Sequence, residues 1–388
     1  MGAAPTDIAT TTRLNTTDSP ISLFLMINTF EVGGSEHQFV LLAQALGAPA
    51  FRVDLGCVNR RGALADEFGD TPQFPLGGSL FGWKSLRARI NLKRHLRSRR
   101  IQVAHAFDFY ANLTLIPAAW FSGVPVIIGS HRQLGDLMSA AQFRAQAAAF
   151  HWCDAVVCNS QAAADRLEAA GVLREKLTVI GNALPASAFE PAPPLLPKRT
   201  GSLRVGMVAR MNARYKNHAG FLRIAAQIHQ RMPQVEFLLA GDGPLRPELE
   251  QQAASMGLAD CVIFLGDRRD IPSVLPSMDV AVLTSDSESL SNVILEAMAA
   301  RLPVVAYNVG GNSELVNEER GALVASGDES DFASAVCRVL SDGNLRRQQG
   351  ENGFRFVKER FSAAQVRRRY EDLYISLLEK KSRKKPAL

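Results

Sequence analysis

Residues 278–308 read MDVAVLTSDSESLSNVILEAMAARLPVVAYN, and this stretch decides the fold. It opens with an apolar run at 280–283 and passes through a polar turn. A helical pattern of apolar residues then runs from about Ser291 until Pro303 ends it. A second apolar run follows at 304–307. The order strand, loop, helix, strand predicts one unit of a parallel β-sheet.

Two carboxylates stand eight residues apart within this unit. Glu288 lies in the predicted loop at the carboxyl end of the strand, and Glu296 lies two turns into the helix. A helix start offers unpaired backbone N–H groups and the positive end of the helix dipole, which favour a phosphate. The unit therefore predicts a phosphate-bearing ligand. The alternative is solvated helix-surface charge, although Glu296 is flanked by Leu295 and Ala297 in a mostly apolar helix.

Size and composition indicate a globular protein. With 388 residues the chain is long enough for two domains with separate cores. A hydrophobic share of 47% and a charged share of 21% exclude disordered and fibrous classes. The net charge of +6 allows association with nucleic acid or an anionic membrane. The five cysteines are scattered without a C-x-x-C pair, so neither a disulfide framework nor a zinc site is indicated, and we expect a cytoplasmic location.

The ends of the chain and its apolar runs bear on location. Residues 1–20 are rich in Thr, Ala and Ser and lack a basic segment followed by an apolar core, so they predict a flexible leader and not a signal peptide. The longest apolar runs, such as 23–27, are far shorter than the roughly 20 residues that span a bilayer. Any membrane contact is therefore expected to be peripheral.

Strand-length apolar runs alternate with helix-length segments along the whole chain, which predicts parallel sheets wrapped by helices. The proline-rich stretch 191–198 is the predicted linker between two doubly wound domains, 21–190 and 199–360. A last amphipathic helix at 361–380 is expected to pack back on the first domain. The ligand would lie between the domains, at the carboxyl ends of the strands.

Polar residues gather at the strand ends and helix start of the second half. With the glycine turns beside them, they comprise Arg210, Lys216, Gly241-Asp242-Gly243, Gly266-Asp267, Glu288, Ser291, Asn292, Glu296 and Gly310-Gly311-Asn312. Two cations, open backbone N–H groups and two carboxylates on one rim suit a nucleotide diphosphate that carries a sugar. The cations can neutralise a leaving diphosphate without magnesium, so we expect neither a metal nor a further cofactor. The alternatives are a surface cluster with Arg214 and, for the glycines, a plain turn.

These residues resemble a known family. The spacing of Glu288 and Glu296 resembles the E-x7-E signature of retaining glycosyltransferases of the GT-B fold, and SDSESLSNVILEAMA is similar to the version in glycosyltransferase family 4. The resemblance covers about residues 21–377. It includes 208–210 with Lys216-Asn217, LAGDGP at 239–244, Gly310-Gly311, VGGSE at 32–36, Asn159-Ser160 and VIGN at 179–182.

The resemblance implies two Rossmann-like domains that face each other across a cleft, and it implies roles for residues. Arg210 and Lys216 would bind the donor diphosphate, Glu296 the ribose and Glu288 the transferred sugar. The amides of residues 290–292 would cap the phosphates. Transfer would retain the anomeric configuration without a protein nucleophile, because the leaving diphosphate helps to deprotonate the acceptor.

The resemblance also implies partners: a UDP- or GDP-sugar donor and a saccharide or lipid-linked acceptor. Gly33 and Gly34 match the acceptor-side loop, where glycines permit close backbone approach. His131 lies where the family often has a polar residue beside the sugar, although a packed histidine is the alternative. Ser289 and Ser291 replace the usual Gly and Pro, which alters the backbone approach to the sugar.

The basic segment 84–100 is the remaining unusual feature. It predicts either a solvated helix face or an amphipathic surface on anionic lipids, with Leu86, Ile90, Leu92 and Leu96 partly on one side. Nucleic acid is disfavoured because no aromatic residues interleave with the charges.

Other functions compete with sugar transfer. The chain could be a catalytically silent protein that binds a sugar nucleotide or nucleic acid, or a GT-B epimerase or phosphorylase. The presence of both acids and both cations argues against a catalytically silent protein. Nothing in the sequence resembles a lysine site for pyridoxal phosphate, which argues against a phosphorylase.

Overall fold

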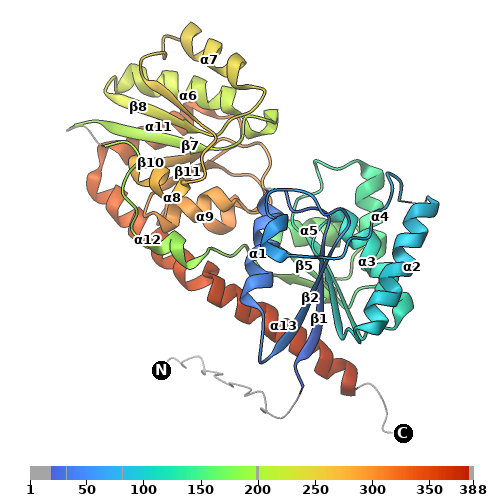
Figure 1. Cartoon of the computed structure of the whole chain (residues 1–388). Helices are drawn as coiled ribbons and strands as arrows, with labels where there is room; N and C mark the ends of the chain where they lie inside the picture. The colour runs from blue at the N-terminus through green and yellow to red at the C-terminus, as the bar shows by residue number, and fades with distance from the viewer. Residues whose placement is uncertain (1–18, 32, 81, 198–200, 384–388) are drawn as a thin grey trace, which may run out of the picture.

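The computed structural model describes residues 19–31, 33–80, 82–197 and 201–383, and its strands form two separate parallel sheets of six strands (Figure 1). Most of the predicted leader and the last residue of the predicted linker lie outside the described residues. The predicted class, two doubly wound α/β domains, is confirmed.

The N-terminal sheet has the strand order β2-β1-β3-β4-β5-β6. Its strands are β1 (Ile21–Ile27), β2 (Phe51–Cys57), β3 (Val103–Ala106), β4 (Val126–His131), β5 (Ala155–Cys158) and β6 (Leu177–Val179). The main helices are α1 (Gly34–Ala45), α2 (Trp83–Ser98), α3 (Phe109–Ser122), α4 (Ala140–Phe150) and α5 (Gln161–Ala169). Six of the seven residues of β1 are buried, because helices cover both faces of a parallel sheet.

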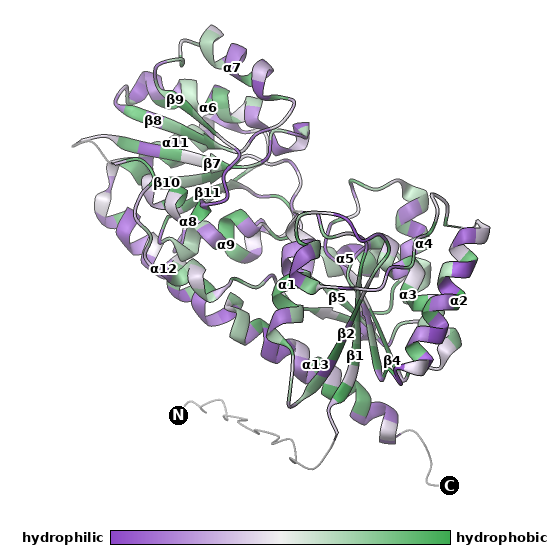
Figure 2. Ribbon diagram, viewed as in Figure 1, coloured by the Kyte–Doolittle hydropathy of each residue, from purple (hydrophilic) through white to green (hydrophobic). Residues whose placement is uncertain are grey.

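The C-terminal sheet has the order β12-β11-β10-β7-β8-β9. Its strands are β7 (Leu203–Val208), β8 (Val235–Ala240), β9 (Val262–Gly266), β10 (Val280–Leu283), β11 (Val304–Tyr307) and β12 (Gly321–Val324). The helices are α6 (His218–Arg231), α7 (Arg246–Ser255), α8 (Ile271–Val274), α9 (Asn292–Ala299), α10 (Asn312–Leu315) and α11 (Glu329–Ser341). Figure 2 shows the apolar strands enclosed by helices whose outer faces are hydrophilic.

Two further helices close the chain, α12 (Gly343–Phe361) and α13 (Ala363–Arg383). The sequence pattern did not predict α12, which contains three glycines and therefore has a low helix propensity. Packing explains two of them: a Cβ at Gly350 would lie 2.0 Å from the carbonyl oxygen of Arg301, and one at Gly353 would lie 3.1 Å from Met298 of α9. Close approach of α12 to α9 outweighs the propensity.

Helix α13 returns the end of the chain to the N-terminal domain, beneath α1 (Figure 1). Tyr374 is fully buried there, and its hydroxyl lies 2.8 Å from Nδ1 of His105. The other ring nitrogen of His105 lies 2.8 Å from the hydroxyl of Ser130. Burial lowers the pKa of His105 to about 3, so this histidine is neutral and fixes α13 to the sheet.

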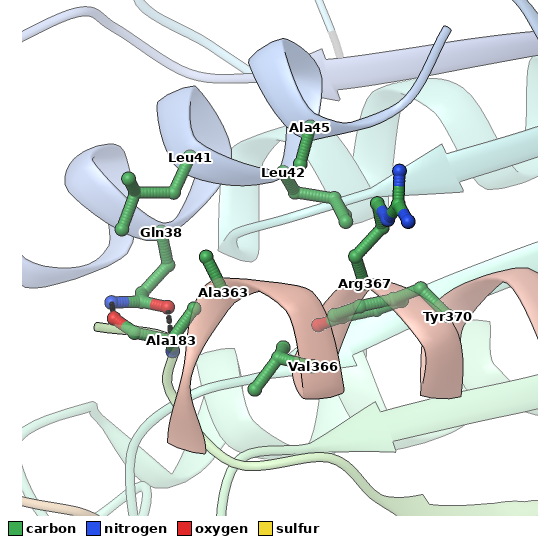
Figure 3. Close-up of a pocket in the computed structure, with 9 residues that line it drawn as sticks. All are labelled: Gln38, Leu41, Leu42, Ala45, Ala183, Ala363, Val366, Arg367 and Tyr370. Atoms are coloured by element: carbon green, nitrogen blue, oxygen red, sulfur yellow. Dashed lines mark hydrogen bonds between the residues drawn. The ribbon is translucent and has the colours of Figure 1, made fainter. Parts of the chain in front are cut away.

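The contact between α1 and α13 is mostly apolar (Figure 3). Leu41, Leu42 and Ala45 of α1 face Ala363, Val366 and Tyr370 of α13. At one end of this contact, Gln38 bonds to both the backbone N–H and the carbonyl of Ala183. The chain crosses between the domains twice, and backbone hydrogen bonds join the two crossing segments. Leu184 N–H donates to the carbonyl of Phe361, and Ala363 N–H donates to the carbonyl of Leu184.

We predict that Tyr374→Phe destabilises the protein by about 1–3 kcal/mol, because it leaves a nitrogen of buried His105 without a partner. Urea unfolding would measure the change. Tyr110→Phe is the matched control, since the Tyr110 side chain is exposed. Equal stability of both variants would contradict the anchoring role of Tyr374.

Candidate active site

The candidate site begins where the order of the C-terminal sheet reverses. β7 and β10, the first and fourth strands of this sheet in chain order, are hydrogen-bonded neighbours at its centre. From β7 the chain continues to β8 on one side, and from β10 it continues to β11 on the other, so the loops that follow the two strands turn in opposite directions. Arg210 and Lys216 follow β7, and Glu288 follows β10. The Nζ atom of Lys216 lies 2.7 Å from Oε1 of Glu288, and the pair is largely buried. The structure thus joins two of the predicted site residues.

The two loops are also tied together through their backbones. Asp286 N–H donates to the carbonyl of Tyr215, and the Thr284 hydroxyl donates to that of Asn217 at 3.0 Å. The Asn217 amide reaches the carboxylate of Asp286 at 3.2 Å. These bonds hold the Lys216 turn beside the Glu288 loop.

Gly241 and Gly243 have a packing role. Both have positive φ, and a Cβ would lie 2.0 Å from the carbonyl oxygen of Ala209 at Gly241 and 2.4 Å from that of Met211 at Gly243. Only glycine permits this approach. The turn therefore supports the loop that carries Arg210, and its predicted contact with the donor stays a prediction.

The loop after β11 supports Glu288 in the same way. A Cβ at Gly310 would lie 1.8 Å from the carbonyl oxygen of Glu288, and Gly311 N–H donates to that oxygen at 3.2 Å. The backbone of Glu288 is therefore fixed, while its carboxylate is held by Lys216.

Glu296 lies in a different environment from Glu288. It sits in α9, whose first turn is capped by the Ser291 hydroxyl, which accepts from Ile294 N–H at 3.3 Å. The Glu296 side chain is partly exposed, and partial burial raises the pKa of its carboxyl group to about 7. Within the described residues the carboxyl group has no hydrogen-bond or ion-pair partner. It can therefore accept hydroxyl groups from a ligand.

The predicted acceptor-side glycines lie opposite this helix. Gly33 caps α1, and a Cβ at Gly34 would lie 3.1 Å from the amide nitrogen of Asn292 at the start of α9. The Glu36 side chain folds over Gly33. Burial raises the pKa of Glu36, and the positive charge of Arg210 acts in the opposite direction. The charge of Arg210 in the C-terminal domain therefore acts on an acid of the glycine loop in the N-terminal domain.

Asp108 is a buried acid beside this loop that the sequence reasoning missed. It follows β3, accepts from the backbone N–H groups of Asn28 and Ala111, and caps α3. Burial raises its pKa to about 6. Its position between a strand pattern and a helix pattern was the available signal, since Asp is a preferred N-cap.

Short polar side chains join the loops of the two domains. Ser289 is buried, and its hydroxyl donates to Oδ1 of Asn159 at 2.6 Å and lies 3.2 Å from the Ser160 hydroxyl. Ser289 stands where the resembled family usually has glycine, so this departure creates a bond between domains. The Asn182 amide likewise donates to Asn292 at 2.6 Å.

Glu314 makes a charged contact between the domains. Its two carboxylate oxygens accept from the backbone N–H groups of Gln161 at 2.9 Å and Ala162 at 3.1 Å. These N–H groups belong to the first turn of α5, where negative charge is favourable. A residue that follows β11 therefore caps a helix of the other domain.

His131 lies at the end of β4 and is buried. Its Nδ1 atom lies 2.8 Å from the Gln146 amide, whereas Nε2 is buried and has no partner in the described part of the chain. Burial lowers the pKa of His131 to about 4, so the ring is neutral. The following loop crosses toward the C-terminal domain, where Asp136 accepts from the Ser287 hydroxyl.

A groove between the domains and the arrangement of possible metal ligands complete the description of the site region. A groove of about 410 Å³ is lined by both domains, including Gly181, Leu290, Glu314 and Phe361, but not by Arg210, Lys216, Glu288 or Glu296. Among the described residues, no group of three His, Cys, Asp or Glu side chains could hold a metal ion.

Two family descriptions match the chain in succession. The model for "Glycosyltransferase Family 4" matches residues 32–187, and the model for "Glycosyl transferases group 1" matches residues 202–342. Each match falls within one of the two sheets and its helices.

Curated relatives agree with these matches. The chain is 28% identical over 277 residues to the lipopolysaccharide core biosynthesis glycosyltransferase LpsE of Rhizobium meliloti (strain 1021). These residues cover 68% of this chain and 75% of LpsE. It is 29% identical over 300 residues to the UDP-Gal:alpha-D-GlcNAc-diphosphoundecaprenol alpha-1,3-galactosyltransferase of Escherichia coli, over 71% of this chain and 77% of the relative.

Solved structures share the fold. The Anabaena protein HepE in complex with UDP superposes with a TM-score of 0.81 at 21% identity, over 92% of this chain and 100% of HepE. HepE in complex with UDP-glucose gives a TM-score of 0.79 at 22% identity over the same shares.

We predict that Glu314→Gln loosens the contact between the domains, because a glutamine has one acceptor oxygen and no charge for the α5 N-terminus. Small-angle X-ray scattering should show a larger radius of gyration, and the cost in stability should be about 0.5–2 kcal/mol. Glu318→Gln, at an exposed position nearby, is the control. An unchanged radius of gyration would argue against this capping role.

Proposed function

The chain is a glycosyltransferase of the GT-B fold that resembles family 4, and from that premise we propose a retaining transfer of sugar from a nucleotide-diphosphate sugar to a hydroxyl group. One observation carries the proposal: the Lys216–Glu288 ion pair, which lies where the strand order of the C-terminal sheet reverses. The carboxyl group of Glu296 in α9 supplies a second acid in the same β10–α9 unit. A cation and two acids, one of them held in an ion pair, suit a ligand with both phosphates and hydroxyls.

The donor would lie along the C-terminal domain. Arg210 and Lys216 bind the diphosphate, with the N–H groups of residues 290–292 at its phosphates. When Lys216 turns to the diphosphate, Glu288 is released to accept hydroxyls of the transferred sugar. Glu296 accepts the ribose hydroxyls. A UDP-sugar is the favoured donor, because the Escherichia coli relative is named for UDP-Gal and HepE was solved with UDP and UDP-glucose.

The chemistry follows from these positions. The two cations neutralise charge on the leaving diphosphate, so the proposal requires no metal ion. The leaving diphosphate accepts the proton of the attacking hydroxyl on the same face of the sugar, and no side chain acts as a nucleophile. His131 is neutral, and its buried Nε2 atom can bond to a sugar hydroxyl when the loop above it moves.

The acceptor would lie on the N-terminal domain, near Gly33 and Gly34. A saccharide or a lipid-linked saccharide is favoured, since one relative is named for lipopolysaccharide core biosynthesis and another for a diphosphoundecaprenol-linked sugar. Assembly of lipopolysaccharide or another polysaccharide is the proposed process. The five cysteines are unpaired thiols, which suits a cytoplasmic location.

We predict that Arg210→Ala weakens binding of UDP by about tenfold or more, whereas Glu288→Gln abolishes transfer and largely preserves UDP binding. Calorimetry would measure UDP binding, and release of nucleoside diphosphate from a panel of donor sugars would measure transfer. Arg214→Ala is the matched control, because Arg214 lies in the same loop but pairs with Glu248 at the surface. Unchanged UDP affinity in Arg210→Ala would refute the donor assignment, and the absence of any turnover would favour a silent binding protein.

A second prediction concerns pH. Because burial places the pKa of Glu296 at about 7, much of this group is protonated at pH 6 and ionised at pH 8. Ribose hydroxyls that donate to the carboxylate favour its ionised form, so UDP binding should release a proton near pH 7 and tighten as pH rises.

Calorimetry in buffers with different ionisation enthalpies would count the released protons. Glu296→Gln keeps the titration of the nucleotide itself and should lose only the contribution of this carboxyl group. The same proton count in wild type and variant would remove Glu296 from the ribose site.

A further inference from the structure

Among the residues that the structure describes, the exposed large hydrophobic side chains all lie in the N-terminal domain. Within the described residues there are nine of them, and every one lies between residues 83 and 173: Trp83, Leu86, Ile90, Tyr110, Trp120, Phe121, Leu137, Trp152 and Leu173. Contiguous exposed apolar surface on a globular protein marks an interaction site more often than chance would place it. The first three lie on α2, which Figure 1 shows at the outer edge of this domain, away from the C-terminal domain.

Helix α2 has two apolar faces. Leu92 and Leu96 are buried in the core, whereas Leu86 and Ile90 are exposed. The prediction placed these four residues partly on one side of the helix. The structure divides them between two faces, because the core takes the face that Leu92 and Leu96 share. Trp83, Leu86 and Ile90 follow the spacing i, i+3, i+7 and line the outer face. Trp83 is 82% exposed.

The charges on this outer face are all positive. Arg87 and Arg94 extend the same row at i+4 and i+11, and the sequence from residue 83 to residue 107 contains no acid. Neither arginine has a hydrogen-bond or ion-pair partner among the residues that the structure describes. The face therefore combines exposed hydrocarbon with uncompensated guanidinium groups.

Three aromatic side chains continue the surface beyond the end of α2. The rings of Trp120 and Trp152 are stacked at 5.8 Å, and Phe121 lies edge-on to Trp120 at 4.9 Å. Arg97 joins them to α2, because its guanidinium donates to the backbone carbonyls of Phe121 and Ser122. From Trp83 to Arg97 the helix is about 21 Å long, so the surface extends over at least that distance.

We propose that this surface, here called the basic aromatic face and defined by Trp83, Arg87, Ile90, Arg94, Trp120 and Trp152, docks on an anionic lipid bilayer. The tryptophans enter the headgroup region, where rings with one polar N–H are favoured. Ile90 and Leu86 reach the hydrocarbon boundary, and the arginines meet lipid phosphates. Exposed aliphatic side chains favour a bilayer over nucleic acid, because bases stack on rings and not on aliphatic groups.

Docking would be peripheral. No helix of the described residues is long and apolar enough to cross a membrane. The inference rests on the surface alone and does not depend on the proposed sugar transfer. If both hold, the face would bring a lipid-linked acceptor to the domain that carries Gly33 and Gly34.

The three tryptophans of the chain make the test direct, because all of them belong to this face. Their fluorescence would be recorded on the full-length protein with vesicles of phosphatidylcholine, alone or mixed with phosphatidylglycerol, and with brominated analogues of these lipids. We expect a blue shift and quenching by brominated lipid with the anionic vesicles, both reduced by high salt.

Charge reversal supplies the control. Arg87→Glu combined with Arg94→Glu should lower vesicle partitioning by about tenfold or more. Arg338→Glu combined with Arg355→Glu changes the net charge equally on exposed positions of the C-terminal domain and should leave partitioning within about twofold. Circular dichroism would verify that both variants are folded.

Several outcomes would overturn the proposal. Vesicle binding without quenching would place the contact on another face. Equal losses of partitioning in the two charge variants would show that net charge, and not the basic aromatic face, drives the binding. Equal binding to neutral and anionic vesicles would refute the requirement for anionic lipid. No binding to either kind of vesicle would refute docking on a bilayer. A fluorescence change with polysaccharide or single-stranded oligonucleotide but not with vesicles would assign the face to that ligand instead.

Discussion

The parallel pairing of β7 with β10 is the constraint on which the candidate site depends. It brings the carboxyl ends of the first and fourth strands of the C-terminal sheet together, and the chain leaves them in opposite directions. The Lys216–Glu288 ion pair is a consequence of that geometry. The glycine loops at 241–243 and 310–311 then fix the two strand ends, because their backbones pack where any side chain would collide.

The two domains are held by two different kinds of contact. On the side of α13 the contact is apolar and buried, as the packing of Val366 and Tyr374 into the N-terminal core shows. Between the loops it consists of hydrogen bonds from Ser289, Asn182 and Glu314. Each such bond contributes only about 1 kcal/mol net, because water can replace it, whereas separating α13 from its domain would expose apolar side chains. This arrangement suits a protein whose ligands enter between its domains.

The two acids of the motif show how environment separates groups that look alike in the sequence. Glu288 is held by a lysine 72 residues away in the chain, whereas Glu296 lies among apolar neighbours with its pKa raised to about 7. Their spacing of eight residues places one in a loop and one in a helix. It does not reveal that one is paired and the other is not.

The sequence by itself determined the alternation of strands and helices, the strand–loop–helix–strand unit at 278–308 and the gathering of polar residues at strand ends, because periodicity and capping are set by near neighbours. Tertiary structure alone decided that Lys216 meets Glu288, that Ser289 bonds to Asn159 across 130 residues, and which face of α2 is buried. It also decided that the glycine-containing stretch 343–361 is helical. These outcomes depend on the packing of segments far apart in the chain, which no local pattern records.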